Sequence, residues 1–201
     1  NYFNDGIYEG LLNYDKYKNS HSPVFIIFLK YLISYNLNLG ISLYIIICST
    51  APLIFYFAYK EKFKSQKLLI VFYLSQFFIL SPYFRSSAIW PGDENLAILL
   101  FIISIYFYVS FSKTSEPNLR IRSMVLNIVF LALASYFRPI YALFSLFFFY
   151  EIILKNFKIN HFIIYIFTNL IFALPALYYV FILKVTFFYN TVGSFNLVNS
   201  I

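Results

Sequence analysis

The chain has 201 residues, of which 61% are hydrophobic, 24% aromatic and only 11% charged, and its mean hydropathy is +0.74. Soluble domains carry about 25% charged residues, so this composition excludes an ordinary soluble domain and predicts an integral membrane protein. The formal net charge is +7. Surplus Lys and Arg orient membrane proteins and contact anionic lipids, so we expect membrane lipids, and no nucleic acid, among the partners.

The chain begins with one long polar stretch, residues 4–25, which reads NDGIYEGLLNYDKYKNSHSPVF. It carries Asp5, Tyr8 and His21 and ends at a proline before a hydrophobic run. The first residue is Asn and no signal peptide is visible, so we expect a fragment that lacks at least one N-terminal span. The single cysteine, Cys48, lies in an apolar run and excludes an intrachain disulfide framework.

The next segment, Val24–Ile33, is apolar but short, and Lys30 interrupts it. Apolar runs of about 10–14 residues are more often interfacial than membrane-spanning. Pro23 suits the first turn of a helix, and a lysine at this depth reaches the headgroups. We therefore predict a helix that lies along the outer face. If the segment crosses the membrane instead, Asp5 lies in the cytoplasm.

Longer apolar runs predict transmembrane helices, each of which needs about 20 residues. Six are found, and the fourth and fifth are short enough to form a hairpin whose tip lies below the outer headgroups: Leu39–Tyr59, Leu68–Phe84, Leu96–Phe111, Met124–Phe137, Ile140–Leu154 and Phe162–Leu183. The predicted fold is an all-α polytopic bundle of about six transmembrane helices with an outer juxtamembrane helix. Residues 1–38 form the outer loop and that helix, and residues 39–201 form one membrane domain.

The loops alternate in charge and predict the orientation. Lysines and arginines concentrate in KEKFKSQK (60–67), KTSEPNLRIR (113–122) and KNFK (155–158). Short loops rich in Lys and Arg remain in the cytoplasm. The alternate connections, which are residues 85–94, the Arg138-Pro139 turn and the tail after Lys184, therefore lie outside.

Arg138 interrupts an otherwise apolar sequence, SYFRPIYAL. Ionisable groups at membrane depth are costly and usually face a partner or a water-filled cavity. A guanidinium matches phosphate oxygens bidentately. The sequence leaves two interpretations open, a headgroup-level anchor and a clamp for a lipid phosphate.

A second polar motif, WPGDEN, places Asp93 and Glu94 directly after a turn and at the start of a helix. Acidic residues stabilise the positive end of a helix dipole, which explains them without any ligand. Adjacent carboxylates also suit a divalent cation. Both interpretations remain open, and the second makes a divalent cation a possible cofactor.

In the predicted outer loop an acidic residue is followed three places later by a tyrosine (Asp5 and Tyr8), and a His-x-Pro sequence (His21-Ser22-Pro23) leads into the juxtamembrane helix. An acidic turn opens a later helix. This arrangement resembles the GT-C glycosyltransferases, in particular the bacterial relatives of protein O-mannosyltransferase and of the lipid A aminoarabinose transferase.

This resemblance implies a sugar transferase in a bacterial plasma membrane with its active face outside. The donor would be a sugar on a polyprenyl phosphate, and the acceptor a lipid, a glycan or a protein. Asp5 would be the general base. The substrate would be bound by Tyr8, His21, Lys30, Arg85 and Arg138, with Arg138 on the lipid phosphate.

Three other functions remain open. A lipid-linked saccharide polymerase or ligase generally has a long outer loop in mid-chain, and none is found here. A transporter has broken helices in paired repeats and ionisable residues at the midplane. The polar interruptions in the spans are few, mainly Gln76, Asn127 and Asn169. A non-enzymatic assembly factor is the third alternative.

Overall fold

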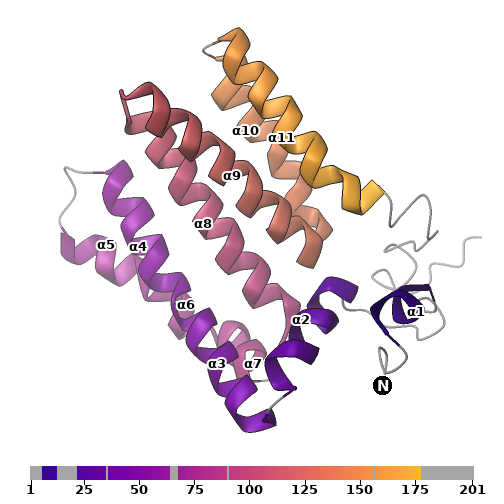
Figure 1. Cartoon of the computed structure of the whole chain (residues 1–201). Coiled ribbons are helices and arrows are strands. Elements are labelled where there is room, and N and C mark those ends of the chain that lie inside the picture. Colours follow the sequence, from indigo (N-terminus) through magenta and orange to yellow (C-terminus); the bar gives the residue numbers. More distant parts are fainter. Residues whose placement is uncertain are drawn as a thin grey trace, which may run out of the picture.

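The computed structural model of the chain describes residues 6–12, 22–34, 36–63, 68–89, 91–155 and 157–177. Within these ranges the secondary structure is entirely helical (Figure 1). The elements in chain order are α1 (Ile7–Leu12), α2 (Pro23–Ile33), α3 (Leu37–Ser49), α4 (Ala51–Lys62), α5 (Leu68–Ser75), α6 (Phe77–Leu80), α7 (Pro82–Ile89), α8 (Asp93–Lys113), α9 (Pro117–Phe137), the 3₁₀ helix η2 (Pro139–Leu143), α10 (Phe144–Phe149), the π-helical turn η3 (Tyr150–Leu154) and α11 (Ile159–Leu177).

Four helices of the described part are long and apolar enough to cross a membrane. They are the consecutive α3–α4, which run as one helical stretch of 26 residues, and α8, α9 and α11. They overlap four of the predicted spans and are compatible with an integral membrane protein. The expected number of six is not confirmed, because the other two predicted spans take different forms.

The predicted span Leu68–Phe84 is divided into α5, α6 and α7, with breaks at Gln76 and Ser81. The hydroxyl of Ser75 donates to the carbonyl of Phe72 at 2.7 Å, and Gln76 Nε2 donates to that hydroxyl at 3.2 Å. At the second break Pro82 opens α7. Serine hydroxyls compete for the helical backbone, and proline removes a helical donor. These polar side chains and the proline explain why a continuously apolar run is divided.

Two expectations for the next pair of spans need correction. Helix α9 begins at Pro117 and has 21 residues, so the predicted start at Met124 and the predicted short span were wrong. Residues with charged side chains, Arg120 and Arg122, belong to its first turns rather than to a loop. The predicted break at Arg138-Pro139 is present, with Arg138 in an extended conformation (φ −137°, ψ 107°), which the following proline favours. The apolar segment Pro139–Leu154 that follows is helical but short.

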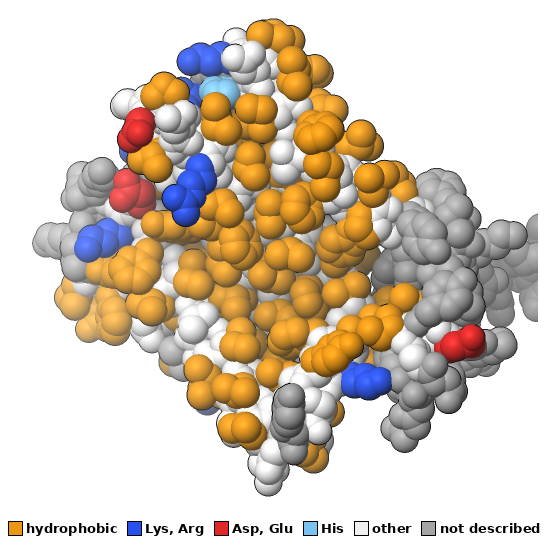
Figure 2. Space-filling model, in the orientation of Figure 1, with side chains coloured by type: hydrophobic (Ala, Val, Ile, Leu, Met, Phe, Trp, Pro, Cys, Tyr) orange, Lys and Arg blue, Asp and Glu red, His pale blue; other side chains and the backbone are white. Residues whose placement is uncertain are grey.

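The helices pack in a row, with α4 against α8, α8 against α9, and α9 against α11 (Figure 1). Many large apolar side chains on their outer surfaces are exposed, such as Phe77 and Leu146 at 71% each, and hydrophobic side chains cover most of one face (Figure 2). Apolar surface of this extent is unfavourable in water. Lipid tails would cover it in a bilayer.

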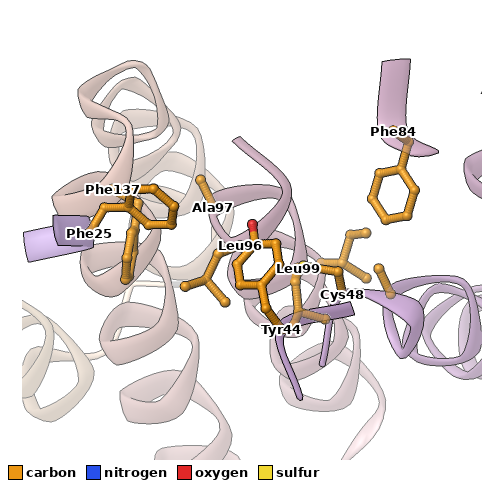
Figure 3. Close-up of a cluster of buried hydrophobic side chains, with 10 residues drawn as sticks. Phe25, Tyr44, Cys48, Phe84, Leu96, Ala97, Leu99 and Phe137 are labelled. Atoms are coloured by element: carbon orange, nitrogen blue, oxygen red, sulfur yellow. The ribbon is translucent and has the colours of Figure 1, made fainter. Parts of the chain in front are cut away.

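The buried side chains form two clusters along the pair α8–α9. The first unites α2, α3, α4, α7, α8 and α9 around Phe25, Tyr44, Leu96 and Phe137 (Figure 3). The second unites α8 and α9 with α10, η3 and α11. Antiparallel α8 and α9 contribute side chains to both clusters, so this pair connects the helices packed at one end of the bundle with those packed at the other.

Helix α2 confirms the predicted helix at Val24–Ile33, with Pro23 in its first turn. Its 11 residues reach about 16 Å, half of the roughly 30 Å hydrocarbon thickness. Phe25 is 1% exposed, and its ring makes edge contacts with Tyr44 and Phe137 at centroid distances of 6.3 and 6.2 Å. The hydroxyl of Ser22 donates to the carbonyl of Tyr136 at 2.6 Å. Helix α2 is therefore fastened to the end of the bundle where α9 ends.

Candidate functional site

The candidate site lies where α8 begins and α9 ends. The turn Pro91-Gly92 directs the chain into α8 with Asp93 as its first residue. Two buried hydrogen bonds hold this entry: the hydroxyl of Tyr44 donates to the carbonyl of Gly92, and Asn95 Nδ2 donates to the carbonyl of Phe84 at 2.9 Å. These bonds connect the start of α8 to α3 and to α7, and they hold the backbone of Asp93 and Glu94 in place relative to those two helices.

Three ionisable side chains converge at this point. Arg138 Nη2 lies 2.9 Å from Asp93 Oδ1, and the same nitrogen contacts Glu94 Oε1. The side chain of Asp93 is 1% exposed, whereas those of Arg138 and Glu94 are 27% and 28% exposed. A ligand entering the site would therefore meet the guanidinium and Glu94 before it met Asp93. We call these three residues the charged cluster.

Helix electrostatics agree with the signs of these charges. The carboxylates lie at the positive end of α8, and the guanidinium lies at the negative end of α9; both placements are favourable. Burial of Asp93 strengthens its attraction to Arg138, because the local dielectric constant is lower than that of water. The charged cluster thus connects α8 to α9 through ion pairs. Its partly exposed members, Arg138 and Glu94, are also accessible to a polar ligand.

An apolar cavity of about 370 Å³ lies between α9, η2, α10 and α11, and its lining does not include the three residues of the charged cluster. Two neighbours of Arg138 in sequence, Tyr136 and Pro139, contribute to its wall, and the opposite wall comes from α11, including Phe172 and Ala176. The lining is mostly apolar, with polar atoms supplied by a few residues such as Ser135 and Asn169. Its chemistry suits a hydrocarbon chain rather than a charged molecule.

The remaining predicted site residues are placed only in part. Lys30 is exposed in the last turn of α2, and Arg85 is exposed in α7. The backbone of Tyr8 belongs to α1, while Asp5 and His21 lie outside the described residues. The structure therefore brings Arg138, Asp93 and Glu94 together and leaves the predicted roles of the other five as predictions.

The possible metal site also stays a prediction. Within the described ranges no group of three or more His, Cys, Asp or Glu side chains is arranged to hold a metal ion. Asp93 and Glu94 contact a guanidinium here, so a divalent cation would have to displace Arg138 or use ligands from elsewhere.

Sequence reasoning missed the residues that support the cluster. Tyr44, Asn95 and Ser22 each make a hydrogen bond to a backbone carbonyl of a distant segment. Asn95, directly after the two acids, was the only one with a visible signal, since it is a polar residue within an apolar helix. Tyr44 was indistinguishable from the many other tyrosines of the chain.

Searches against protein-family models, curated proteins and solved structures find no match to this chain.

Proposed function

We propose that this chain is a membrane glycosyltransferase that moves a sugar from a polyprenyl phosphate to a lipid, glycan or protein acceptor at the outer face of the membrane. One observation supports the proposal above the others. The segment that carries a partly exposed arginine, held by two carboxylates, also contributes Tyr136 and Pro139 to the wall of an apolar cavity between helices. A lipid phosphate needs this combination, a guanidinium for its head and a hydrocarbon surface for its tail.

In the proposed reaction the acceptor hydroxyl oxygen attacks the anomeric carbon of the sugar. A new C–O bond forms while the bond from that carbon to the phosphate oxygen breaks, and polyprenyl phosphate leaves with the electron pair. Asp5 takes the proton of the hydroxyl as general base. A single displacement of this kind inverts the configuration at the anomeric carbon.

Arg138 has the capacity to stabilise the charge that develops on the leaving phosphate. Its Nη2 is engaged by both carboxylates, but its Nε is buried and makes no hydrogen bond with the described residues. Asp93, the buried partner, keeps the guanidinium in place. Glu94, the more exposed partner, is the one that a phosphate displaces.

The apolar cavity takes the first isoprene units of the donor. It is lined by α9, η2, α10 and α11, and Tyr136 closes it on one side by donating its hydroxyl proton to the carbonyl of Phe172. Substitution of the small wall residue Ala176 by Phe therefore weakens donor binding without changing any charge.

The test is transfer of a labelled sugar from a polyprenyl-phosphate donor in membranes that contain the protein. We expect Asp5→Asn to abolish transfer at unchanged expression, and Arg138→Gln to abolish transfer per amount of folded protein. Arg122→Gln removes the same charge from an exposed site at the other end of α9 and leaves transfer unchanged. Full transfer by Arg138→Gln would remove the phosphate role, and full transfer by Asp5→Asn would remove the base.

A further inference from the structure

The opposite end of the pair α8–α9 carries a group of basic side chains, two of which contact one aromatic ring. The guanidinium of Arg120 lies 4.5 Å from the centroid of the Phe111 ring. The ring of His161 makes an edge contact with the same phenyl at 5.9 Å, and Arg120 and Lys158 are the cations close enough to act electrostatically on His161. We call Arg120, Lys158 and His161 the basic cluster.

The basic cluster has unsatisfied polar atoms. Arg120 Nε and His161 Nδ1 are buried and have no hydrogen-bond partner in the described part of the chain, and His161 as a whole is only 7% exposed. No carboxylate of the described residues forms an ion pair with Arg120 or Lys158. By contrast, the neighbouring Lys155 lies 3.3 Å from Glu151. The basic cluster therefore lacks the counter-charge that its neighbour has.

The helix termini at this end add partial positive charge to that of the basic cluster, which favours the binding of an anion. Arg120 lies in the first turns of α9, and Lys158 directly precedes α11 with His161 in its first turn. The N-terminus of a helix carries partial positive charge, so cations there are unfavourable and a phosphate is favourable. Lys and Arg side chains, with acidic side chains among them, lie at the end of the bundle where α9 and α11 begin (Figure 2).

Apolar side chains next to the basic cluster indicate where such a phosphate comes from. Phe157, Ile159 and Ile163 are 61%, 57% and 57% exposed, which gives acyl chains a surface beside the cations. A soluble phosphate has no apolar part that could bind to this surface.

We infer that Arg120, Lys158 and His161 form a binding site for the phosphate of an anionic phospholipid, at the end of the bundle that the sequence predicts to face the cytoplasm. Basic pockets between transmembrane helices on that side recognise anionic headgroups. The ring of Phe111 fixes the guanidinium in place by a cation–π contact. This site is separate from the charged cluster and does not depend on sugar transfer.

The probe is short-chain phosphatidylglycerol, added to the purified full chain in a neutral detergent, with short-chain phosphatidylcholine and inorganic phosphate as parallel additions. The readout is the concentration dependence of the melting temperature. We expect phosphatidylglycerol alone to raise it. Arg120→Gln and Lys158→Gln each weaken the apparent affinity at least about fivefold, the factor that corresponds to about 1 kcal/mol per basic residue.

Arg122→Gln is the matched control, because it removes one charge from the same helix two residues on, about 200° around the axis. It retains the affinity of the unchanged protein. Lys158 is exposed, so its substitution cannot act by misfolding even if Arg120→Gln does. Equal losses in Lys158→Gln and Arg122→Gln would overturn the site in favour of diffuse attraction. An equal rise of melting temperature with inorganic phosphate or phosphatidylcholine would overturn the lipid as ligand.

Discussion

The two ends of the pair α8–α9 differ in how their charged side chains are placed relative to the helix termini. At one end, the charged cluster combines two carboxylates with one guanidinium, each on the helix terminus that its sign favours. At the other end, the basic cluster places Arg120 and His161 against Phe111 and Lys158 close to His161, at helix termini that repel positive charge. Both ends share α8 and α9, but the basic cluster also takes Lys158 and His161 from the start of α11.

The comparison separates charges that stabilise the chain from charges that need a partner outside it. A buried carboxylate with an arginine partner has its counter-charge within the protein, and loss of that partner destabilises the fold. A cation without a carboxylate contributes little to the fold and much to binding. The predictions below test this separation, in order of decreasing effect.

The largest effect is expected from Phe25→Ala, which removes the ring that fastens α2 to Tyr44 and Phe137 beside the charged cluster. We expect a loss of about 4 kcal/mol in the free energy of unfolding, as for other buried phenylalanines. Phe148→Ala, in the second buried cluster, is matched in burial at 2% exposed. Labelling of the buried Cys48, which lies in the first cluster, accelerates in Phe25→Ala and not in Phe148→Ala. Equal labelling rates would show that α2 does not cover this cluster.

Next in size is Arg138→Met, which removes the cation between Asp93 and Glu94. We expect a loss of about 3 kcal/mol, low in the range for broken buried pairs because Arg138 is 27% exposed. Arg122→Met, at an exposed position, changes stability by less than about 0.5 kcal/mol. In the double variant Asp93→Asn/Arg138→Met part of the loss is recovered, and strict additivity in this cycle would contradict the coupling.

A smaller loss is expected from Gly40→Ala, which tests how α2 is seated on α3. An added Cβ would come within 2.7 Å of the Leu32 carbonyl oxygen and of Ile33 Cγ2, and within 2.9 Å of Ile33 Cα. Since backbone atoms must move, we expect a loss of about 2 kcal/mol. Ser42→Ala, at an exposed position on the same helix, serves as control. A neutral Gly40→Ala would place α2 farther from α3.

The smallest effect is expected from salt, which should weaken lipid binding at the basic cluster but hardly change the ion pair in the charged cluster. An increase from 0.1 to 1 M shortens the Debye length from about 10 to about 3 Å. The stabilisation by phosphatidylglycerol should therefore fall strongly. The coupling between Asp93 and Arg138 should change by less than about 0.5 kcal/mol, because buried pairs are screened little. Equal salt dependence of both quantities, measured by thermal unfolding, would remove the distinction between the ends.

Much of the fold was predictable from apolar run length. The helix at Pro23–Ile33 and four of the spans were expected close to where they lie, because length and hydropathy determine them. The start of α9 was missed because Arg120 and Arg122 were assigned to a loop, although both continue the helix. The division of residues 68–84 depends on local hydrogen bonds of Ser75 and Gln76, which a count of apolar residues does not register.

The sequence predicts at which end of the bundle the candidate site lies, but it does not predict which side chains of the site contact one another. Alternating loop charge placed residues 85–94 and Arg138 on one side, and the structure brings Asp93 and Glu94 to Arg138 there. That one guanidinium takes both carboxylates follows from the close antiparallel packing of α8 and α9, which spacing in sequence does not reveal. The basic cluster was missed for the same reason, since Arg120 and His161 meet only through Phe111.

The central claim is that the charged cluster faces the outside and the basic cluster faces the cytoplasm. The direct measurement is labelling of single cysteines by an impermeant maleimide on intact cells, in a Cys48→Ala background. Glu9→Cys and Ser34→Cys, exposed positions on either side of α2, should be labelled from outside, and Ser115→Cys, an exposed position before α9, only after permeabilisation. Labelling of position 115 on intact cells with protection of position 34 would contradict the orientation. Protection of position 9 alone would show that α2 crosses the membrane.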